Sequence, residues 1–345
     1  MMLHNEIHSQ PHVLEALLEH GLPAVESAAA AIRNRRIDYI YLAARGTSEN
    51  AGIYGQYIFG AFNGLPVALA APSLFTVYNR PPQLSNALVI GISQSGQSPD
   101  IIGVIESAVQ QGALSLAITN DPNSPLARSA ALSLDIQAGV EQAVAATKTY
   151  TAQLLTLAML SCTLAEDSER RAELAQLPSA VATILSAEEP IVAAAERLKD
   201  MRHCIVLGRG YHFATALEWS LKLKELTYVV AERYSTAEFQ HGPIALVEPG
   251  FPILAVAPSD PDAATTRALL QRLADERGAE LLVLSDDDDT LALGTMGLRL
   301  PPGVPSWLAP IVSIVPGQLF CYHLALARGL DPGTPRGLSK VTKTR

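Results

Sequence analysis

The chain has 345 residues, of which 48% are hydrophobic and 17% are charged, and it carries a net charge of −9. This length and composition predict a globular protein of one or two domains, and the acidic balance argues against nucleic acid as the main partner. No uninterrupted apolar run approaches the roughly 20 residues that span a bilayer, and the first residues do not resemble a signal peptide. We therefore expect a soluble, cytoplasmic protein with no membrane contact and with three reduced thiols, at Cys162, Cys204 and Cys321.

Strands and helices alternate along the first half of the chain. Apolar residues at helical spacing over residues 12–36 predict one or two lead-in helices. The same spacing predicts further helices over residues 51–62, 101–109 and about 147–164. Short apolar runs without alternation predict buried strands at residues 39–44, 67–70, 88–92, 115–119 and 132–136. Such strands are typical of a parallel sheet that is covered by helices on both faces.

The second half of the chain repeats this pattern. A charged run at residues 166–171 and a helical stretch to residue 200 join the two halves. Strands are predicted at residues 204–207, 253–257, 281–284 and 298–300, and helices at 214–232, 270–276 and 311–326. The predicted fold class is therefore α/β, with two tandem domains, each a mostly parallel five-stranded sheet covered by helices on both faces.

The most informative segment is the loop at residues 91–100, Gly-Ile-Ser-Gln-Ser-Gly-Gln-Ser-Pro-Asp, which joins a predicted strand to a predicted helix. Backbone N–H groups at a helix N-terminus attract anions, phosphate above all. Ser93, Gln94, Ser95 and Ser98 add neutral donors, and the loop contains no Lys or Arg. An ordinary turn rich in serine and glycine is the alternative, and the loop alone leaves both interpretations open.

The second half differs at the corresponding place. Residues 257–260 are Ala-Pro-Ser-Asp, so this half lacks a serine loop and is expected to serve another purpose. Four consecutive acids at residues 286–289 favour a solvated loop over a metal site, because they lack the ligand spacing of a calcium loop.

A second group of candidate residues lies between residues 218 and 241. Lys222 and Glu225 share one face of a predicted helix, and Glu218 could pair with Lys222 equally well. By itself this pattern favours a solvated surface ion pair. His241 follows in a predicted loop at residues 237–243, beside a Gly-Pro pair that fixes the backbone. A lone histidine is more often structural than catalytic.

Six segments of the chain resemble, in this order, the tandem SIS-domain sugar-phosphate isomerase family, and in particular the isomerase half of glucosamine-6-phosphate synthase. The segments are Arg45-Gly-Thr-Ser, Ser93-Gln-Ser-Gly-Gln-Ser, Ala145-Ala-Thr-Lys, Leu221-Lys-Leu-Lys-Glu, Glu238-Phe-Gln-His-Gly-Pro and Pro335-Arg-Gly-Leu-Ser-Lys. The resemblance divides the chain into a helical lead-in (1–36), a first SIS domain with the phosphate loop (37–165), a helical linker (166–198), a second SIS domain (199–330) and a catalytic tail (331–345).

The resemblance also implies roles for the matching residues. Glu225 would move a proton between C1 and C2 of the sugar, with help from Lys222. His241, supplied by the neighbouring subunit, would open the sugar ring, and Lys340 would form an imine with the open-chain ketose. The residues implied in binding the sugar phosphate are Thr47, Ser48, Ser93, Gln94, Ser95, Ser98, Val144 and Ser339. Ala146 stands where the family commonly has serine.

Composition and resemblance disagree on the C-terminal segment. The basic residues from 333 to 345 predict a disordered tail by composition, whereas the resemblance implies an ordered segment that closes over the substrate.

The function implied by the resemblance is an amino-sugar phosphate isomerase and deaminase that converts glucosamine 6-phosphate to fructose 6-phosphate and ammonia. It implies a homodimer, no cofactor and no metal ligands. The glutaminase half of the synthase and its N-terminal cysteine have no counterpart here, so we expect no glutaminase activity. The alternatives are a fructosamine-6-phosphate deglycase, a galactosamine- or tagatose-phosphate isomerase, and a non-catalytic sugar-phosphate sensor.

Overall fold

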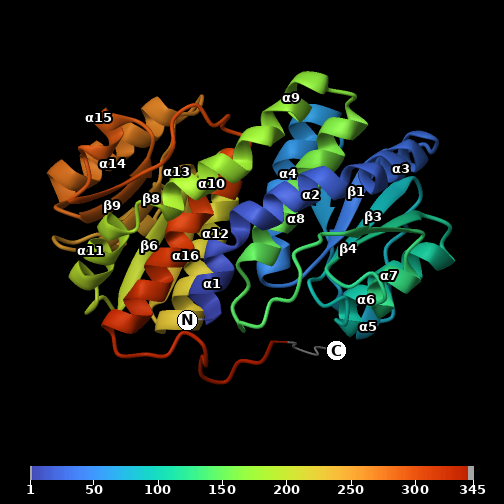
Figure 1. Ribbon diagram of the computed structural model, residues 1–345, viewed down its shortest axis with the longest axis horizontal. Helices are drawn as coiled ribbons and strands as arrows, with labels where there is room; N and C mark the ends of the chain where they lie inside the picture. Colours follow the sequence, from blue (N-terminus) through green and yellow to red (C-terminus); the bar gives the residue numbers. More distant parts are fainter. Residues whose placement is uncertain (1, 341–345) are drawn as a thin grey trace. The chain divides into compact units, whose positions relative to one another are not determined.

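The computed structural model describes residues 2–340 and contains two compact α/β units (Figure 1). The N-terminal unit comprises residues 12–142, 148–175 and the chain from residue 339. The C-terminal unit comprises the chain up to residue 11 together with residues 143–147 and 176–338. Each unit holds one five-stranded sheet, so the predicted α/β class with two sheets is confirmed.

The sheet of the N-terminal unit is parallel throughout and has the strand order β2-β1-β3-β4-β5. Its strands are β1 (Tyr39–Ala43), β2 (Val67–Leu69), β3 (Ala87–Ile92), β4 (Leu114–Thr119) and β5 (Leu132–Asp135). Every residue of β3 and β4 is buried, which explains why these strands read as unbroken apolar runs.

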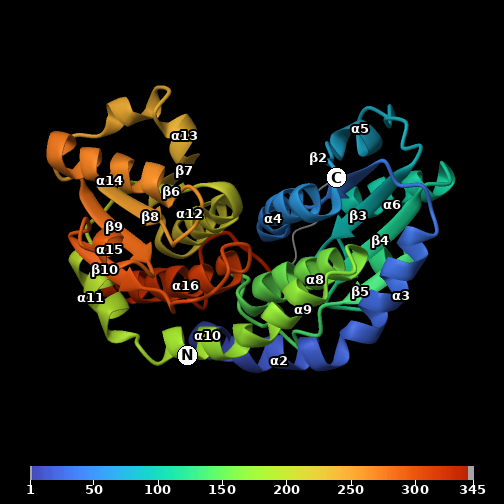
Figure 2. The same cartoon turned by 90° about the horizontal axis from the view of Figure 1, so that it is seen from above.

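Helices cover both faces of this sheet (Figure 2). One face packs against α5 (Ser73–Thr76), α6 (Pro99–Gln110) and α7 (Pro125–Ser129). The other face packs against α3 (Leu22–Arg33) and α4 (Thr47–Asn63), and α8 (Lys148–Leu164) packs against both of these helices. The remaining helices of this part of the chain are α2 (Gln10–His20), α9 (Ser168–Glu173) and the 3₁₀ turn η1 (Leu174–Gln176).

The sheet of the C-terminal unit is also parallel, with the order β10-β9-β8-β6-β7. Its strands are β6 (His203–Gly208), β7 (Val230–Ser235), β8 (Pro252–Val256), β9 (Glu280–Ser285) and β10 (Met296–Arg299). Counted from β7, the strands follow the same chain order as those of the first sheet counted from β2. The internal repeat predicted from the sequence is therefore present in the topology.

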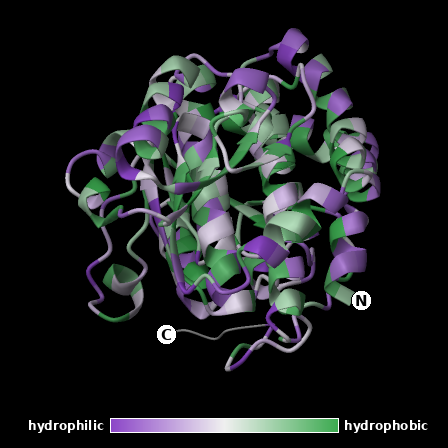
Figure 3. Ribbon diagram, turned by 90° about the vertical axis from the view of Figure 1, so that its left-hand side faces the viewer, coloured by the Kyte–Doolittle hydropathy of each residue, from purple (hydrophilic) through white to green (hydrophobic). Residues whose placement is uncertain are grey.

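Helices again cover both faces. One face packs against α13 (Thr236–Phe239) and α14 (Ala263–Arg277), with η3 (Pro243–Leu246) close by. The helices on the other face are α10 (Leu177–Leu185), α11 (Glu189–Arg197), α12 (Phe213–Thr227) and α16 (Ala309–Ala327). The unit is completed by α1 (Met2–His8), η2 (Gly210–His212) and α15 (Asp288–Leu291). Hydrophobic and hydrophilic residues recur in turn along the helices that cover the sheet (Figure 3).

The structure corrects one predicted helix. The helix expected over residues 214–232 ends at Thr227, and residues 230–235 form strand β7. Tyr228 ends the helix because it adopts the left-handed conformation, with φ of 59°, and β7 then pairs along the length of β6. The segment 237–243, expected as a loop, begins within the short helix α13.

Of the described helices, α16 alone is long and apolar enough to cross a membrane by length and composition. Its apolar window is 89% buried inside the protein, and it packs against α10, α11 and α12. A helix that is apolar all round and buried is typical of the core of a soluble protein.

Candidate active site

Most of the predicted phosphate-binding residues follow the carboxyl ends of two neighbouring strands of the N-terminal sheet, β1 and β3, where the chain connections reverse direction. β1 and β3 are neighbours, with Ala43 paired to Gly91 near their carboxyl ends, but the chain leaves them toward opposite edges of the sheet. Ligands of open α/β sheets bind outside the carboxyl ends of the strands at such a switch point. The segments that follow these two strands carry Thr47, Ser48, Ser93, Gln94, Ser95 and Ser98.

Glycine is required at one point of the serine loop. Gly96 has φ of 60°, and a Cβ atom there would lie 2.1 Å from Oγ of Ser124. The Gly96 N–H donates to the carbonyl oxygen of Ser93 at 3.1 Å, and its carbonyl oxygen accepts from the N–H of Leu126 at 3.0 Å. These contacts hold the loop in one conformation before α6 begins.

Hydroxyl groups lie at the start of the two helices that follow β1 and β3. Ser98 is the N-cap residue of α6 but makes no capping hydrogen bond, and its hydroxyl lies 3.3 Å from that of Ser93. Thr47 is the first residue of α4, and the nearly buried Ser48 accepts a hydrogen bond from the Gln153 amide at 3.1 Å. Two helix N-termini and several neutral donors suit a phosphate group.

An ion pair that the sequence did not predict flanks this loop. Nε of Arg45 donates to Oδ2 of Asp100 at 2.8 Å, and the Asp100 side chain is only 2% exposed. Asp100 lies in the first turn of α6, where the helix dipole favours a carboxylate. Residues 91–100 contain no Lys or Arg, but Arg45 brings a positive charge that the carboxylate of Asp100 compensates. The 55 residues that separate the two gave no local signal.

The corresponding edge of the C-terminal sheet is acidic. Arg209 lies 3.1 Å from Asp262, and the buried His212 lies 3.4 Å from Asp260. The Ser259 N–H donates to the carboxylate of Asp286 at 2.6 Å. This end of the C-terminal sheet therefore carries paired carboxylates where the N-terminal sheet carries the serine loop.

The run of four acids leads from a loop into the short helix α15, and arginines pair with its side chains. Asp287 caps α15 by accepting from the N–H of Thr290 at 2.8 Å, and it also pairs with Arg267 at 2.7 Å. Asp288 pairs with Arg299, and both Asp288 and Asp289 are exposed. The segment is therefore a loop only at residues 286–287, whereas Asp288 and Asp289, the exposed pair, begin α15.

The candidate acid–base residues on α12 form a buried charge cluster. Lys222 is 1% exposed, lies 3.3 Å from Glu218, which is fully buried, and also donates to Glu225. Burial disfavours the charged form of Lys222, but the carboxylates of Glu218 and Glu225 outweigh this effect and raise its pKa above the ordinary value. The alternative of a solvated surface pair is therefore wrong. Glu225 is the member of this cluster that retains exposure, at 22%.

Two other predicted site residues of the C-terminal unit, His241 and Val144, lie outside the charge cluster on α12. His241 is exposed, and within the described residues its ring makes no hydrogen bond, while its backbone N–H donates to the Glu238 carbonyl oxygen at 2.9 Å. Val144 is half-buried in the segment 143–147. The Ala143 N–H that precedes it donates to the buried carboxylate of Glu6 at 3.2 Å.

The C-terminal segment is anchored as far as the structure describes it. The Arg336 N–H donates to the Tyr228 hydroxyl at 2.9 Å, and the Arg336 guanidinium stacks 3.8 Å from the Tyr228 ring centroid. Ser339 is exposed, and Lys340 donates to Glu141 at 2.6 Å. The disordered tail expected from composition is therefore wrong for residues 333–340; residues 341–345 lie outside the described part.

Glu141 is the main site residue that the sequence did not predict. Its side chain is buried, and it accepts from the N–H and hydroxyl of Thr149 at 3.2 and 2.8 Å. Thr149 lies in the first turn of α8, so the carboxylate also benefits from the helix dipole. The one sequence feature that could have indicated Glu141 is that it is a single acid in the mainly small and apolar segment before Thr147-Lys148.

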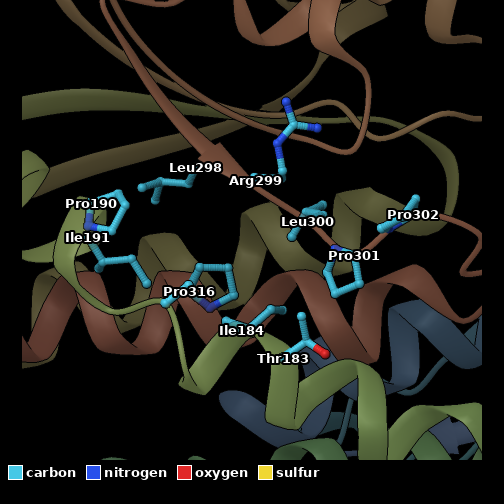
Figure 4. Close-up of a pocket in the computed structure, with 11 residues that line it drawn as sticks. Thr183, Ile184, Pro190, Ile191, Leu298, Arg299, Leu300, Pro301, Pro302 and Pro316 are labelled. Atoms are coloured by element: carbon cyan, nitrogen blue, oxygen red, sulfur yellow. The ribbon is translucent and has the colours of Figure 1, made fainter.

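A separate pocket in the C-terminal unit does not supply acid–base chemistry (Figure 4). It has a volume of about 190 Å³ and an apolar lining that includes Ile184, Leu298, Pro301 and Pro316. No carboxylate, histidine or lysine lines it.

The three cysteines are free and buried, as predicted. Burial raises the pKa of Cys162 and of Cys204 to about 12 and raises that of Cys321 well above its ordinary value. These thiols therefore stay protonated at neutral pH and are poor nucleophiles.

Comparison with known proteins agrees with this geometry. The SIS domain pattern matches residues 34–162 and 197–328. A protein of Gloeobacter violaceus named glutamine–fructose-6-phosphate aminotransferase (isomerizing) is 37% identical over 97% of this chain and 57% of its own length. The chain thus spans just over half the length of the curated relatives it matches.

Two solved structures share the fold across nearly the whole chain. One, from Silicibacter pomeroyi DSS-3 and described as a candidate phosphosugar isomerase, is 35% identical with a TM-score of 0.86, covering 96% of this chain and 99% of its own. The other is the C-terminal domain of glucosamine-fructose-6-phosphate aminotransferase from Francisella tularensis, 31% identical with a TM-score of 0.88, covering 96% and 97%. The chain therefore belongs to the SIS-domain family and contains two copies of the domain.

Proposed function

We propose that this chain is an amino-sugar phosphate isomerase and deaminase that converts glucosamine 6-phosphate and water to fructose 6-phosphate and ammonia. The observation that carries the proposal is the cluster on α12, in which Glu225 is fixed by the buried Lys222 and still exposed on one side. A proton shift between adjacent carbons needs a carboxylate that is held in place and can reach the substrate.

The phosphate group is bound by neutral donors in the N-terminal unit. The helix N-termini of α4 and α6 and the hydroxyls of Thr47, Ser93 and Ser98 supply partial positive charge without a free cation. Gln94, Ser95, Ser48, Ser339 and Val144 complete the proposed contacts. Binding by neutral donors allows the phosphorylated product, fructose 6-phosphate, to leave, because no strong ion pair has to be broken.

The reaction begins with the closed sugar ring. His241 transfers a proton to the ring oxygen as the ring opens, and its exposed imidazole is free to do so from a neighbouring subunit of a homodimer. Glu225 then removes the proton at C2 of the open aldose and returns it to C1. O1 gains a proton and the C2 amino group loses one, which leaves an imine of ammonia at C2. Lys222 remains protonated and stabilises the Glu225 carboxylate.

Ammonia leaves by exchange with an amine of the chain. Lys340 attacks the C2 imine, the C–N bond to ammonia breaks, and a lysine imine remains. Water then adds to this imine, and fructose 6-phosphate and the free lysine are released. Lys340 must be neutral when it attacks, and Glu141 is placed to accept its proton. The steps consume one water and need no cofactor.

The protein is expected to work in a reducing compartment such as the cytoplasm. Three buried free thiols, with no disulfide among the described residues, support this expectation.

A substrate panel tests the proposal. The panel contains glucosamine 6-phosphate, galactosamine 6-phosphate, a fructosamine 6-phosphate and tagatose 6-phosphate, with ammonia, ketose phosphate and free amine measured separately. Release of ammonia and fructose 6-phosphate in equal amounts from glucosamine 6-phosphate is expected. Turnover of another member alone would favour a deglycase or a galactosamine- or tagatose-phosphate isomerase. Binding without turnover of any member would favour a sugar-phosphate sensor.

A further inference from the structure

Three histidines surround one carboxylate in the C-terminal unit, and the proposed reaction uses none of them. Nε2 of His4 lies 2.9 Å from Oε1 of Glu188, and Nε2 of His323 contacts the same oxygen. Nε2 of His8 lies 3.3 Å from the other carboxylate oxygen. The groups come from three separate segments: α1, the residue before α11, and α16.

The donor atoms already have the spacing of metal ligands. One ring nitrogen of His4, one ring nitrogen of His323 and one oxygen of Glu188 all lie within 4.8 Å of one another. In a tetrahedral zinc site with bonds of roughly 2.0–2.1 Å, ligand atoms lie about 3.4 Å apart. Side-chain shifts of about an ångström, well within rotamer motion, would therefore bring the three donors onto one ion.

The cluster is suited to a cation in charge and access as well. Glu188 contributes a carboxylate to the cluster, and His4, His8 and His323 each direct a ring nitrogen toward it. The four side chains are between 17% and 34% exposed, which leaves a path for an ion from solvent.

We propose that His4, Glu188 and His323 bind a zinc ion, with His8 holding the second oxygen of Glu188. Two imidazoles and one carboxylate are a donor set that zinc accepts, whereas magnesium and calcium prefer oxygen ligands alone. His8 orients the Glu188 carboxylate in the way that outer partners orient metal ligands. A fourth coordination position is left for water.

The bound zinc joins three elements of the C-terminal unit. α1 has only seven residues, too few to form a stable helix in isolation, and it packs against α16. Coordination by His4 would fix α1 to α16 and to the start of α11. The ion therefore has a structural role, and binding should stabilise the folded chain.

The experiment uses the full chain, prepared without a polyhistidine tag and treated with a chelator. Zinc is then titrated, bound zinc is counted after gel filtration, and thermal unfolding is measured in parallel. One zinc per chain and a rise in Tm of several degrees are expected, with no rise on adding magnesium. Cobalt should give the visible absorption bands of a four-coordinate site.

Matched variants locate the ion. His4→Gln and His323→Gln should each weaken zinc binding by about 100-fold or more, and His8→Gln by about 10- to 100-fold. His20→Gln is the control, because His20 is an exposed histidine 3.7 Å from Glu19 outside the cluster. It should bind zinc as the unchanged chain does.

Two results would overturn the proposal. One is the absence of bound zinc and of a cobalt spectrum at a stoichiometric concentration of metal, which would leave a cluster that binds protons only. The other is retention of full affinity in both ligand variants, which would place the ion elsewhere. If one ligand variant fails to fold, the other and His8→Gln still decide between these outcomes.

Discussion

Nζ of Lys340 lies 2.6 Å from Oε2 of Glu141, whose side chain is fully buried at the start of α8. A buried carboxylate is costly unless it is paired, so Glu141 and Thr149 together hold the end of the described chain in place. An amine that forms an imine must first lose a proton, and this carboxylate is positioned to receive it. The pair therefore links the order of the C-terminal segment to the proposed chemistry.

The base is tested by Glu225→Gln. The amide keeps the size of the side chain but cannot accept the C2 proton, so we expect turnover to fall by roughly 10²- to 10⁴-fold with little change in Tm. Steady-state ammonia release measures the effect, and Glu276→Gln, an exposed position on α14, is the control. Turnover within a few-fold of the unchanged chain would assign the base to another residue.

The buried charge cluster is tested by Lys222→Met. Removing the lysine takes away the positive charge that lies 3.3 Å from the fully buried Glu218, so we expect the free energy of unfolding to fall by about 3–5 kcal/mol. Urea denaturation measures the change. Adding Glu218→Gln to the same chain should restore much of the loss, whereas Lys199→Met, which breaks an exposed pair, should have little effect. A Lys222→Met chain as stable as the original would contradict the cluster's energetic role.

The phosphate loop is tested by Gly96→Ala. The new methyl group would meet Ser124 and distort the loop, whereas Gly112→Ala imposes a left-handed alanine with no neighbour within 4 Å. In the unchanged chain, glucosamine 6-phosphate should raise Tm more than glucosamine does. We expect Gly96→Ala to lose this difference and Gly112→Ala to keep it. If glucosamine 6-phosphate and glucosamine raised the Tm of the unchanged chain equally, the serine loop would not be a phosphate-binding site.

The sequence predicted the central strands well, but it predicted the end of helix α12 and the edge strand β7 poorly. β3 and β4 lie between other strands and under helices on both faces, so their composition alone reveals them. β7 is an edge strand with exposed residues such as Val230, and it follows a helix that ends without glycine or proline. A left-handed Tyr228 gives no local signal, so the helix was predicted to continue.

The residues of the candidate site also fall into those that the sequence predicted and those that it did not. The serine loop was found because its hydroxyls and glycines are consecutive in the sequence. Glu141 and the Arg45–Asp100 pair were missed because their partners are distant in the chain. The burial of Lys222 was missed as well, since an i, i+3 charge pair usually lies on a surface. Packing of α12 against α16 decides its environment.

The proposed homodimer is tested by subunit mixing. Glu225→Gln chains and His241→Ala chains are each expected to be inactive. If His241 acts on the partner's substrate, a mixed dimer contains one intact site of two, and random exchange makes half of the dimers mixed. Activity of about a quarter of the unchanged protein is therefore expected. No recovery after demonstrated exchange would mean that His241 acts within its own subunit.

The most direct test of the account is reduction of the imine on Lys340. The chain is incubated with fructose 6-phosphate and borohydride, digested, and analysed by mass spectrometry. We predict that one reduced ketose phosphate is attached to the peptide that contains Lys340, and that trapping disappears in Lys340→Gln but persists in Lys199→Gln. Absence of the adduct at a saturating ketose concentration, or an adduct on another lysine, would contradict the proposed chemistry.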